Sequence, residues 1–161
     1  MVVLSEEMDG AMEIDAIALK RHPSSQPQAT FQQLTISMGL CESDTLSETY
    51  GDNYIPGTKT TVLEESNFTV NAPAGDEWFY VNLEEPYWYN GEDNLILEFE
   101  WPGGTGSLYV YHWFTGENRA VNGGYGSGSG YLEGNIPHML LSGTLSFDQM
   151  TFGRIKTILI Q

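Results

Sequence analysis

The sequence predicts an all-β protein, an antiparallel β-sandwich of jelly-roll type with at most one short helical turn. Apolar and polar residues alternate over most segments, which is the period-two pattern of half-buried strands. Gly, Pro, Asn and Asp cluster between these segments at near-regular spacing, as turn residues do. Segments with helical periodicity are nearly absent. Many short strands joined by regular turns are typical of two packed sheets.

The first half of the chain provides five expected strands and one expected helical turn. Apolar residues alternate with polar ones from Leu34 to Leu40, which indicates a half-buried strand. The segment HPSSQPQ (22–28) is expected to be a loop, because its two prolines cannot donate to a strand ladder. Ser43 or Asp44 is placed to cap a helical turn that ends near Thr49. The strands are expected at about residues 11–20, 34–40, 59–64, 67–71 and 77–83.

The second half is expected to contain a hairpin and two late strands. The segment 95–101 alternates apolar and polar positions, and the glycine-rich turn 102–106 leads to a partner strand at 108–114. The segment NGGYGSGSG (122–130) is expected to be a loop. Two late strands are expected at about residues 137–147 and 154–160. The whole chain, 1–161, is expected to form a single domain. Within it, a core module spans about 11–142, and the segment 143–161 carries the final strand.

The charge of the chain excludes some classes of partner. Asp and Glu total 22 against 6 Lys and Arg, which gives a formal net charge of -16. Such a field repels phosphate backbones and anionic lipid surfaces, so we expect no nucleic-acid partner. No apolar run approaches the ~18 residues of a spanning helix, so we expect no membrane insertion. The first ten residues, MVVLSEEMDG, show no signal-peptide pattern. The single cysteine, Cys41, is expected to be a small buried hydrophobic residue at the end of a strand.

Four segments of the chain occur together in a recognisable order. They are FQQLTISMGLCESDTLSETYGDNY, NFTVNAPAGDEWFYVNLEEPYWYNGEDNLILEFEW, NRAV and NIPHMLL. Together they resemble a β-sandwich module that recurs in large secreted or cell-surface proteins of bacteria. The most specific match is YNGEDNL (89–95), and the tail MTFGRIKTILI is similar to the final strand of such proteins. Cys41 departs from the pattern, because a His or polar residue is usual at this position of the module. The resemblance implies an extracellular or cell-surface location and an all-β architecture, with no settled activity.

Two similar turns are candidates for a calcium site. Asp52 and Asn53 in the first turn, and Asp93 and Asn94 in the second, offer the carboxylate and amide oxygens that Ca²⁺ prefers. The loop at 76–77 would add charge if it lay at the same rim. The alternative interpretation is that these side chains bond their own backbone and fold the turns. Neither turn has the spacing of an EF-hand. The role expected for a bound ion is to stabilise the fold and not to take part in catalysis.

An aromatic strip is the second candidate site. Tyr109, Tyr111 and Trp113 fall at i, i+2 and i+4, which places them on one face of a strand. Trp88, with its aromatic neighbours in an adjoining loop, would extend this strip. If the aliphatic face carrying Leu108 is the core side, the aromatic rings are exposed and suited to stacking on sugar rings. The alternative is that both faces are buried, as aromatic residues usually are.

Evidence for catalysis is weaker than evidence for binding. Glu98 and Glu100 share a strand face about 7 Å apart at the backbone, a separation compatible with glycoside cleavage. An outward-facing strand of an acidic protein carries such pairs by default, however. His22, His112 and His138 show no spacing typical of a zinc site, and no serine lies in a nucleophile elbow. We therefore expect no enzymatic activity.

The function predicted from the sequence is binding. We expect a non-catalytic extracellular or cell-surface module for adhesion or carbohydrate binding, with a glycan or another cell-surface ligand as partner and Ca²⁺ as a stabilising ion. The alternative is a structural subunit of a surface layer or filament that self-associates through edge or terminal strands. The apolar segment 155–160 is the candidate donor strand, unless it is an ordinary last strand of its own sheet.

Overall fold

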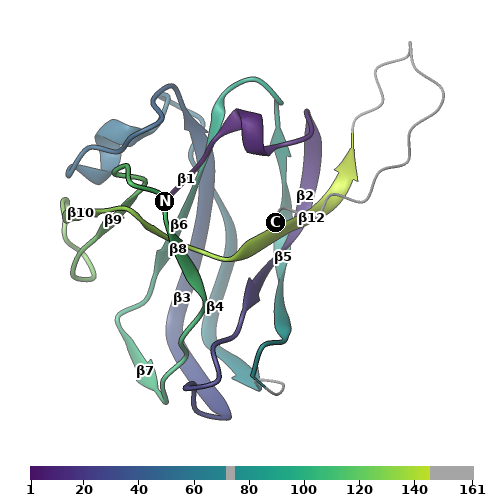
Figure 1. Ribbon diagram of the computed structural model, residues 1–161, viewed down its shortest axis with the longest axis vertical. Coiled ribbons are helices and arrows are strands. Elements are labelled where there is room, and N and C mark those ends of the chain that lie inside the picture. Colours follow the sequence, from purple (N-terminus) through teal and green to yellow (C-terminus); the bar gives the residue numbers. More distant parts are fainter. Residues whose placement is uncertain (72–74, 146–161) are drawn as a thin grey trace.

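The computed structural model describes residues 1–71 and 75–145, which form antiparallel sheets that face each other (Figure 1). The larger sheet has the order β1–β6–β3–β4, with β7 paired to one end of β3, and the second sheet has the order β12–β2–β5. Two small ribbons pair β9 with β10 and β8 with β11. The predicted all-β, antiparallel architecture is confirmed, and it is consistent with a β-sandwich.

The strands in chain order are β1 (Val2–Val3), β2 (Met12–Lys20), β3 (Gln28–Cys41), β4 (Thr60–Asn71), β5 (Trp78–Tyr89), β6 (Asn94–Glu100), β7 (Gly103–Thr105), β8 (His112–Phe114), β9 (Ala120–Asn122), β10 (Tyr131–Glu133), β11 (Asn135–Pro137) and β12 (Met139–Leu145).

Three strands are longer than expected. β3 begins six residues before Leu34, and β4 is one strand where two were expected, because β4 pairs with β3 through a register shift at Ile36/Ser37 instead of breaking. β5 likewise continues to Tyr89 through Pro86. This proline is tolerated because β5 lies at the edge of its sheet, opposite the irregularity between Ile14 and Ala16 of β2.

The expected hairpin between residues 95–101 and 108–114 is wrong. β6 pairs with β3 on one side and with β1 on the other, and β8 pairs with β11. The turn 102–106 does not reverse the chain onto β6, because residues 103–105 continue along the same side of β3 as β7. The glycine-rich segment therefore extends one sheet instead of closing a hairpin.

Two short helical turns are present among the described residues, where at most one was expected. They are the 3-10 turns η1 (Ser5–Glu7) and η2 (Tyr50–Asn53). The helical turn predicted between Ser43 and Thr49 does not form. That segment is instead held by Asn53, whose side chain bonds the backbone of Ser47 and Thr49. No helix in the described part of the chain is long and apolar enough to cross a membrane.

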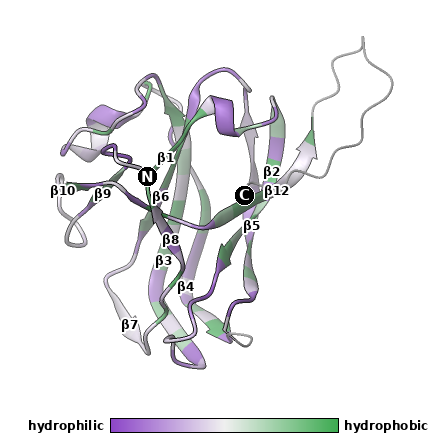
Figure 2. Ribbon diagram, viewed as in Figure 1, coloured by the Kyte–Doolittle hydropathy of each residue, from purple (hydrophilic) through white to green (hydrophobic). Residues whose placement is uncertain are grey.

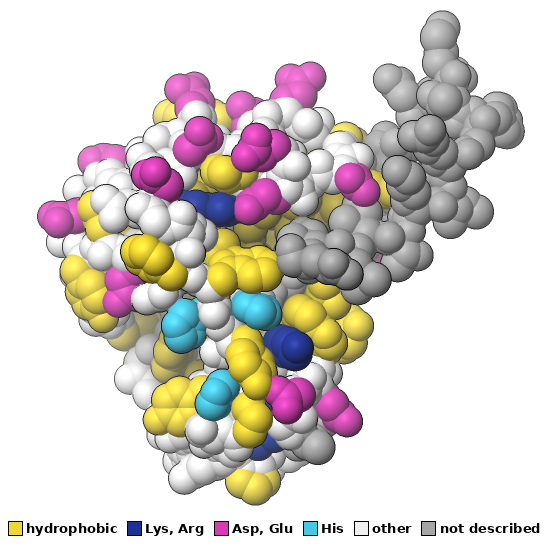
Figure 3. Space-filling view, viewed as in Figure 1, with side chains coloured by type: hydrophobic (Ala, Val, Ile, Leu, Met, Phe, Trp, Pro, Cys, Tyr) yellow, Lys and Arg dark blue, Asp and Glu magenta, His cyan; other side chains and the backbone are white. Residues whose placement is uncertain are grey.

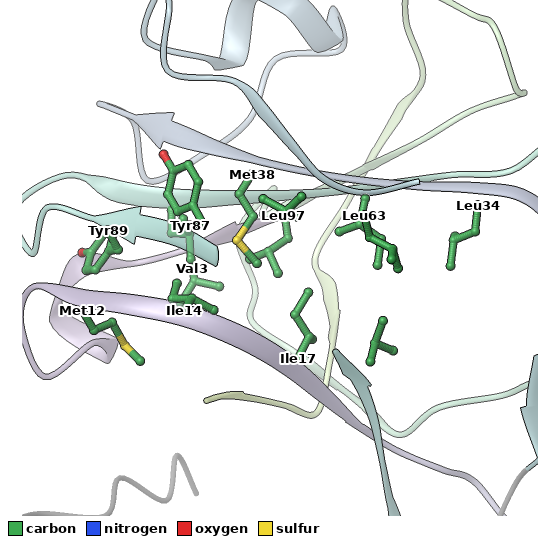
Figure 4. Packing of buried hydrophobic residues seen from close by; sticks show 14 of the residues in the cluster. Val3, Met12, Ile14, Ile17, Leu34, Met38, Leu63, Tyr87, Tyr89 and Leu97 are labelled. Carbon is green, nitrogen blue, oxygen red and sulfur yellow. The ribbon is translucent and has the colours of Figure 1, made fainter. Parts of the chain in front are cut away.

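The core lies between the two sheets. Figure 2 shows hydrophobic and hydrophilic residues alternating along the long strands, and Figure 4 shows buried side chains of the facing strands meeting in the interior. Fully buried members include Ile14 and Ile17 of β2, Met38 of β3 and Leu97 of β6. A second cluster of Val2, Cys41, Leu46 and Ile96 lies on the outer face of the larger sheet. Cys41 is thus the expected buried hydrophobe, and burial raises the pKa of its thiol.

Candidate functional site: a row of aromatic rings

A junction of three chain segments builds the site. Where β2 ends, the backbone N–H of Lys20 donates to the carbonyl of His138 at 3.2 Å. The N–H of His138 donates to the carbonyl of Tyr111 at 2.8 Å, and the N–H of Tyr111 donates to the carbonyl of Lys20 at 2.9 Å. These three bonds form a closed set, so the side chains of all three residues are held on a rigid backbone.

The aromatic side chains at this junction form a row. The ring centroids of His22 and Tyr111 are 4.9 Å apart, those of Tyr111 and His138 are 5.8 Å apart, and those of His138 and Trp113 are 4.3 Å apart. We call His22, Tyr111, His138 and Trp113 the ring row. All four side chains are half-buried, so each contacts its neighbours and retains some exposed surface. Tyr109, two residues before Tyr111, is 55% exposed.

Polar groups accompany the ring row. The ammonium group of Lys20 lies 5.3 Å from the ring centroid of Tyr111, and the Tyr111 hydroxyl donates a hydrogen bond to Asp76. This hydrogen bond, with burial and the charge of Asp76 adding to it, raises the pKa of Tyr111. The N–H of Ser24 donates to Nδ1 of His22 at 3.1 Å, so a neutral His22 ring carries its proton on Nε2. The site thus combines ring faces with a cation, a carboxylate and an imidazole.

The predicted strip is partly as expected. Tyr109 and Tyr111 face outward while Leu108 and Val110 pack against the core, which agrees with the predicted alternation. The alternation does not continue in β8, where Phe114 is 74% exposed instead of facing the core. The change follows from the pairing of β8 with the short strand β11, which lies outside the two main sheets.

Trp88 does not extend the strip. It lies on β5 and not in a loop, opposite Glu13, whereas the ring row begins near Lys20. Glu13 and Lys20 are seven positions apart on β2, about 23 Å along a strand. Trp88 is exposed, but the neighbouring residues Tyr87 and Tyr89 face inward and are buried in the core. Trp88 therefore provides a surface tryptophan remote from the ring row.

Sequence reasoning missed the histidines of this face. The three histidines of the chain lie on one face, with hydrophobic side chains between them (Figure 3). His22 and His138 belong to the ring row, and the charge of His112 acts on His138. The only sequence signal was their residue type, because the three positions meet through long-range pairing. Across the residues that the structure describes, no group of three or more His, Cys, Asp or Glu side chains is arranged to hold a metal ion.

The side chains of the two Asx-rich turns bond within the protein. Asn53 is buried, and its Oδ1 accepts the N–H of Ser47 at 2.6 Å. Asn94 Oδ1 accepts the N–H of Ser5 at 2.8 Å, and its amide donates to Asp44 at 2.8 Å. Asp93 Oδ2 accepts from the Asn90 amide at 2.7 Å. These bonds favour the alternative interpretation, in which Asx side chains fold the turns.

Backbone geometry supports the same interpretation of the second turn. Asn90 Oδ1 accepts the N–H groups of Glu92 and Asp93, which is an Asx turn. Gly91 has φ of +80°, and a Cβ there would lie 2.4 Å from the backbone nitrogen of Ala11. Asp76 lies beside Tyr111 and not at this rim, so it adds no charge to either turn. Asp52 is exposed, and Ca²⁺ binding at either turn stays a prediction.

The carboxylate pair on β6 is separate from the ring row. Glu98 accepts a hydrogen bond from the Tyr54 hydroxyl at 2.9 Å and forms an ion pair with Lys59. Burial, together with the charge of Glu98, raises the pKa of Tyr54. Glu98 and Glu100 both line an apolar cleft beside β6. The partners of Glu98 are therefore Tyr54 and Lys59 and not residues of the ring row.

Comparison of the chain with protein-family models, with curated proteins and with solved structures gives no match. The resemblance to a bacterial β-sandwich module therefore stays a prediction from the sequence. The chemistry of the ring row is the basis for a functional assignment.

We expect the ring row to stabilise the folded protein less in mild acid than at neutral pH. Burial first, and then the positive charges of Lys20 and His112, lower the pKa of His138 below its usual 6.5. The unfolded chain therefore takes up this proton at a higher pH than the folded protein does. The contribution of His138 to the free energy of unfolding should fall as the pH decreases from about 6.5 through the lowered pKa.

Chemical denaturation at several pH values checks this expectation. The wild-type protein should lose stability more steeply below pH 6.5 than the variant His138→Gln, which cannot titrate. An NMR titration of the His138 ring gives the pKa directly. A value at or above 6.5 would contradict the expectation.

Proposed function

We propose that this protein is a non-catalytic binding module of β-sandwich architecture, with jelly-roll topology, that recognises neutral carbohydrate through the ring row. The observation that carries the proposal is the row itself: four rings in sequence, fixed by the Lys20–Tyr111–His138 junction. Aromatic faces stack on the C–H faces of sugar rings, and a rigid backbone lowers the entropic cost of binding. Tyr109, exposed at the end of the same strip, extends the contact area.

The polar groups around the row suit sugar hydroxyls. Lys20 donates hydrogen bonds, Asp76 accepts them, and the half-buried imidazole of His22 donates through Nε2. A few placed polar groups beside apolar ring faces are the usual composition of a small-molecule site. The formal net charge of -16 disfavours anionic polysaccharides and nucleic acid, so neutral glycans fit best.

Adhesion or glycan binding is favoured over glycoside cleavage. Among the described residues, Asp76 is the carboxylate that contacts the ring row, and no second carboxylate hydrogen-bonds to the row to complete an acid and base pair. The pair formed by Glu98 and Glu100 lies at a different feature, where Glu98 is held by Lys59 and Tyr54. A glycosidase needs two carboxyl groups flanking one bond. Together with the resemblance to a module of secreted bacterial proteins, this supports an extracellular or cell-surface role.

A glycan array, followed by calorimetric titration with neutral oligosaccharides, tests the proposal. Tyr111→Ala and Trp113→Ala should each weaken binding by about tenfold or more, because each removes one stacking face. Tyr111→Phe keeps the ring and loses the bond to Asp76, so its effect should be smaller. Trp88→Ala is the matched control, since Trp88 is an exposed tryptophan far from the row.

Two results would contradict the proposal. One is the absence of binding across the array and across insoluble polysaccharides such as cellulose, xylan and chitin. The other is a loss of binding in Trp88→Ala that equals the loss in Trp113→Ala. Circular dichroism on each variant ensures that a loss of binding is not a loss of fold.

A further inference from the structure

A cleft runs beside β6 and reaches the junction that carries the ring row, since Leu19, Val110 and Pro137 belong to its lining. It has a volume of about 660 Å³, which is within the range of ligand sites. Its inner wall is apolar and comes from both main sheets, whereas its outer wall carries tyrosines and two carboxylates. The inner wall includes Phe31, Phe79, Phe99 and Val110, and the outer wall includes Tyr50, Tyr54, Glu98 and Glu100.

The backbone edge of β6 is open at this cleft. β1 pairs with β6 at Leu95 and Ile96, and Met1 continues this pairing by exchanging hydrogen bonds of 2.9 and 3.0 Å with Leu97. Hydrogen-bonding residues of an antiparallel pair recur every two positions, so Phe99 directs its N–H and carbonyl to the same side. Over residues 1–71 and 75–145, no strand pairs with Phe99 on that side.

The open edge continues beyond β6. β7 pairs with β3 on the same side as β6 does, and in the described part of the chain it has no second partner. The edge therefore extends from Phe99 to Thr105, about 20 Å of strand. An unpaired edge above an apolar cleft is a template for an added strand, whose alternate side chains would enter the cleft.

The C-terminal segment of the chain has the composition of such a strand. Residues 154–160 read RIKTILI and lie outside the described residues. In an extended conformation, Arg154 and Lys156 share one face with Ile158 and Ile160, and Ile155, Thr157 and Leu159 share the other face. The chain has only 6 Lys and Arg residues, and two of them fall in this segment.

Charge complementarity sets the register. Glu98 and Glu100 share the outer face of β6, two positions apart, and Lys59 pairs with only one of them. A strand that places Arg154 and Lys156 against these glutamates puts Ile155 beside Phe99. The uncharged face of the strand then enters the cleft. In a parallel alignment, the rest of the segment continues beside β7.

The course of β12 favours donation to another molecule. β12 begins at Met139, opposite Leu19, which lines the cleft, and ends at Leu145, opposite Met12. The chain thus leaves β12 running away from the cleft, toward the opposite end of the sandwich (Figure 1). The described part of the chain therefore ends at Leu145, at the opposite end of β12 from the cleft. A strand donated from one copy to the cleft of another is a heterologous, head-to-tail contact, which builds rings or open chains of molecules.

We propose that residues 154–160 of one molecule add as a strand to the β6–β7 edge of a second copy and fill its cleft, so that the protein assembles head to tail. This assembly uses the backbone edge of β6 and β7, which the ring row does not include, and the proposal does not rest on carbohydrate binding. An extended strand supplies both the missing backbone partners and the apolar side chains that the cleft accommodates.

Charge reversal in the full-length chain tests the proposal. Sedimentation velocity and light scattering over a range of concentrations should show large species for the wild-type protein. Glu100→Lys and Lys156→Glu should each weaken association by about tenfold, and the double variant should restore it. Glu65→Lys, which reverses an exposed glutamate on β4, is the matched control and should leave association unchanged.

Mixing the two single variants distinguishes a second copy from the same chain. In a mixture, each variant offers the partner that the other needs, so large species should form again. A monomeric wild-type protein at all concentrations would overturn the proposal. A second result would also overturn it. If the double variant recovered the thermal stability of the wild-type protein and the mixture of single variants did not associate, residues 154–160 would occupy the cleft of their own molecule.

Discussion

Replacing Tyr89 by alanine should lower the free energy of unfolding by about 4 kcal/mol. Tyr89 is fully buried between the sheets, in contact with the core cluster that Figure 4 shows. Its hydroxyl donates to the carbonyl of Asp93 at 2.7 Å, so it also fixes the turn that joins β5 to β6. The alanine variant removes the ring and the hydrogen bond together, and leaves a cavity that the rigid strands cannot fill.

Two variants separate the contributions. Tyr80→Ala, on the same strand but 59% exposed, should change the free energy of unfolding by about 0.5 kcal/mol or less. Tyr89→Phe keeps the ring and should cost about 1 kcal/mol for the lost hydrogen bond. Urea denaturation monitored by circular dichroism measures all three. Equal losses for Tyr80→Ala and Tyr89→Ala would contradict the burial of Tyr89.

Strand positions in this protein are readable from local alternation. The strand β6 (Asn94–Glu100) directs Leu95, Leu97 and Phe99 toward the core cluster, as the sequence indicates. The first strand likewise begins at Met12 and ends at Lys20, close to the expected limits. Each of these patterns depends only on which side chains meet the core, and the alternation of a strand encodes this directly.

Strand pairing could not be read in the same way. The expected hairpin placed residues 108–114 against β6 because the two are neighbours in sequence, but β3 and β1 occupy β6 instead. Both partners come from the first quarter of the chain. The alternation within a segment carries no information on which distant strand will pair with it. Continuation of β5 through Pro86 was missed for a related reason, because it depends on the irregular pairing with β2.

The candidate site, too, could be predicted from the sequence only where its residues lie on one strand. Spacing alone placed Tyr109 and Tyr111 together on an outward face. The ring row also needs His22 and His138, which reach Tyr111 and Trp113 through the junction at the end of β2. Sequence analysis finds the part of the site that lies within one strand, and structure is needed for the part that three segments build together.

Glu7→Gln should lower the free energy of unfolding by about 2 kcal/mol at neutral pH. The buried guanidinium of Arg119 donates from Nη1 to Glu7 Oε1 at 2.9 Å, donates from Nη2 to the second carboxylate oxygen, and also bonds the carbonyl of Val2. Glu7 therefore balances a charge that is removed from water. The glutamine variant keeps the shape and leaves that charge without its counterion. Because Glu7 is about one third exposed, the expected cost lies below that of a fully buried pair.

The same ion pair predicts a dependence on acid. Burial acts to raise the pKa of Glu7, but the hydrogen bonds and charge of Arg119 outweigh it, and the pKa lies below the usual 4.5. A lowered carboxyl pKa stabilises the folded state above about pH 4.5, and this contribution is lost as the pH falls through the folded-state value. The wild-type protein should therefore lose stability below pH 4.5 more steeply than Glu7→Gln. Glu6→Gln, which changes the exposed neighbour, should follow the wild-type curve, and a Glu7→Gln curve parallel to that of the wild type would show that the pair does not titrate with folding.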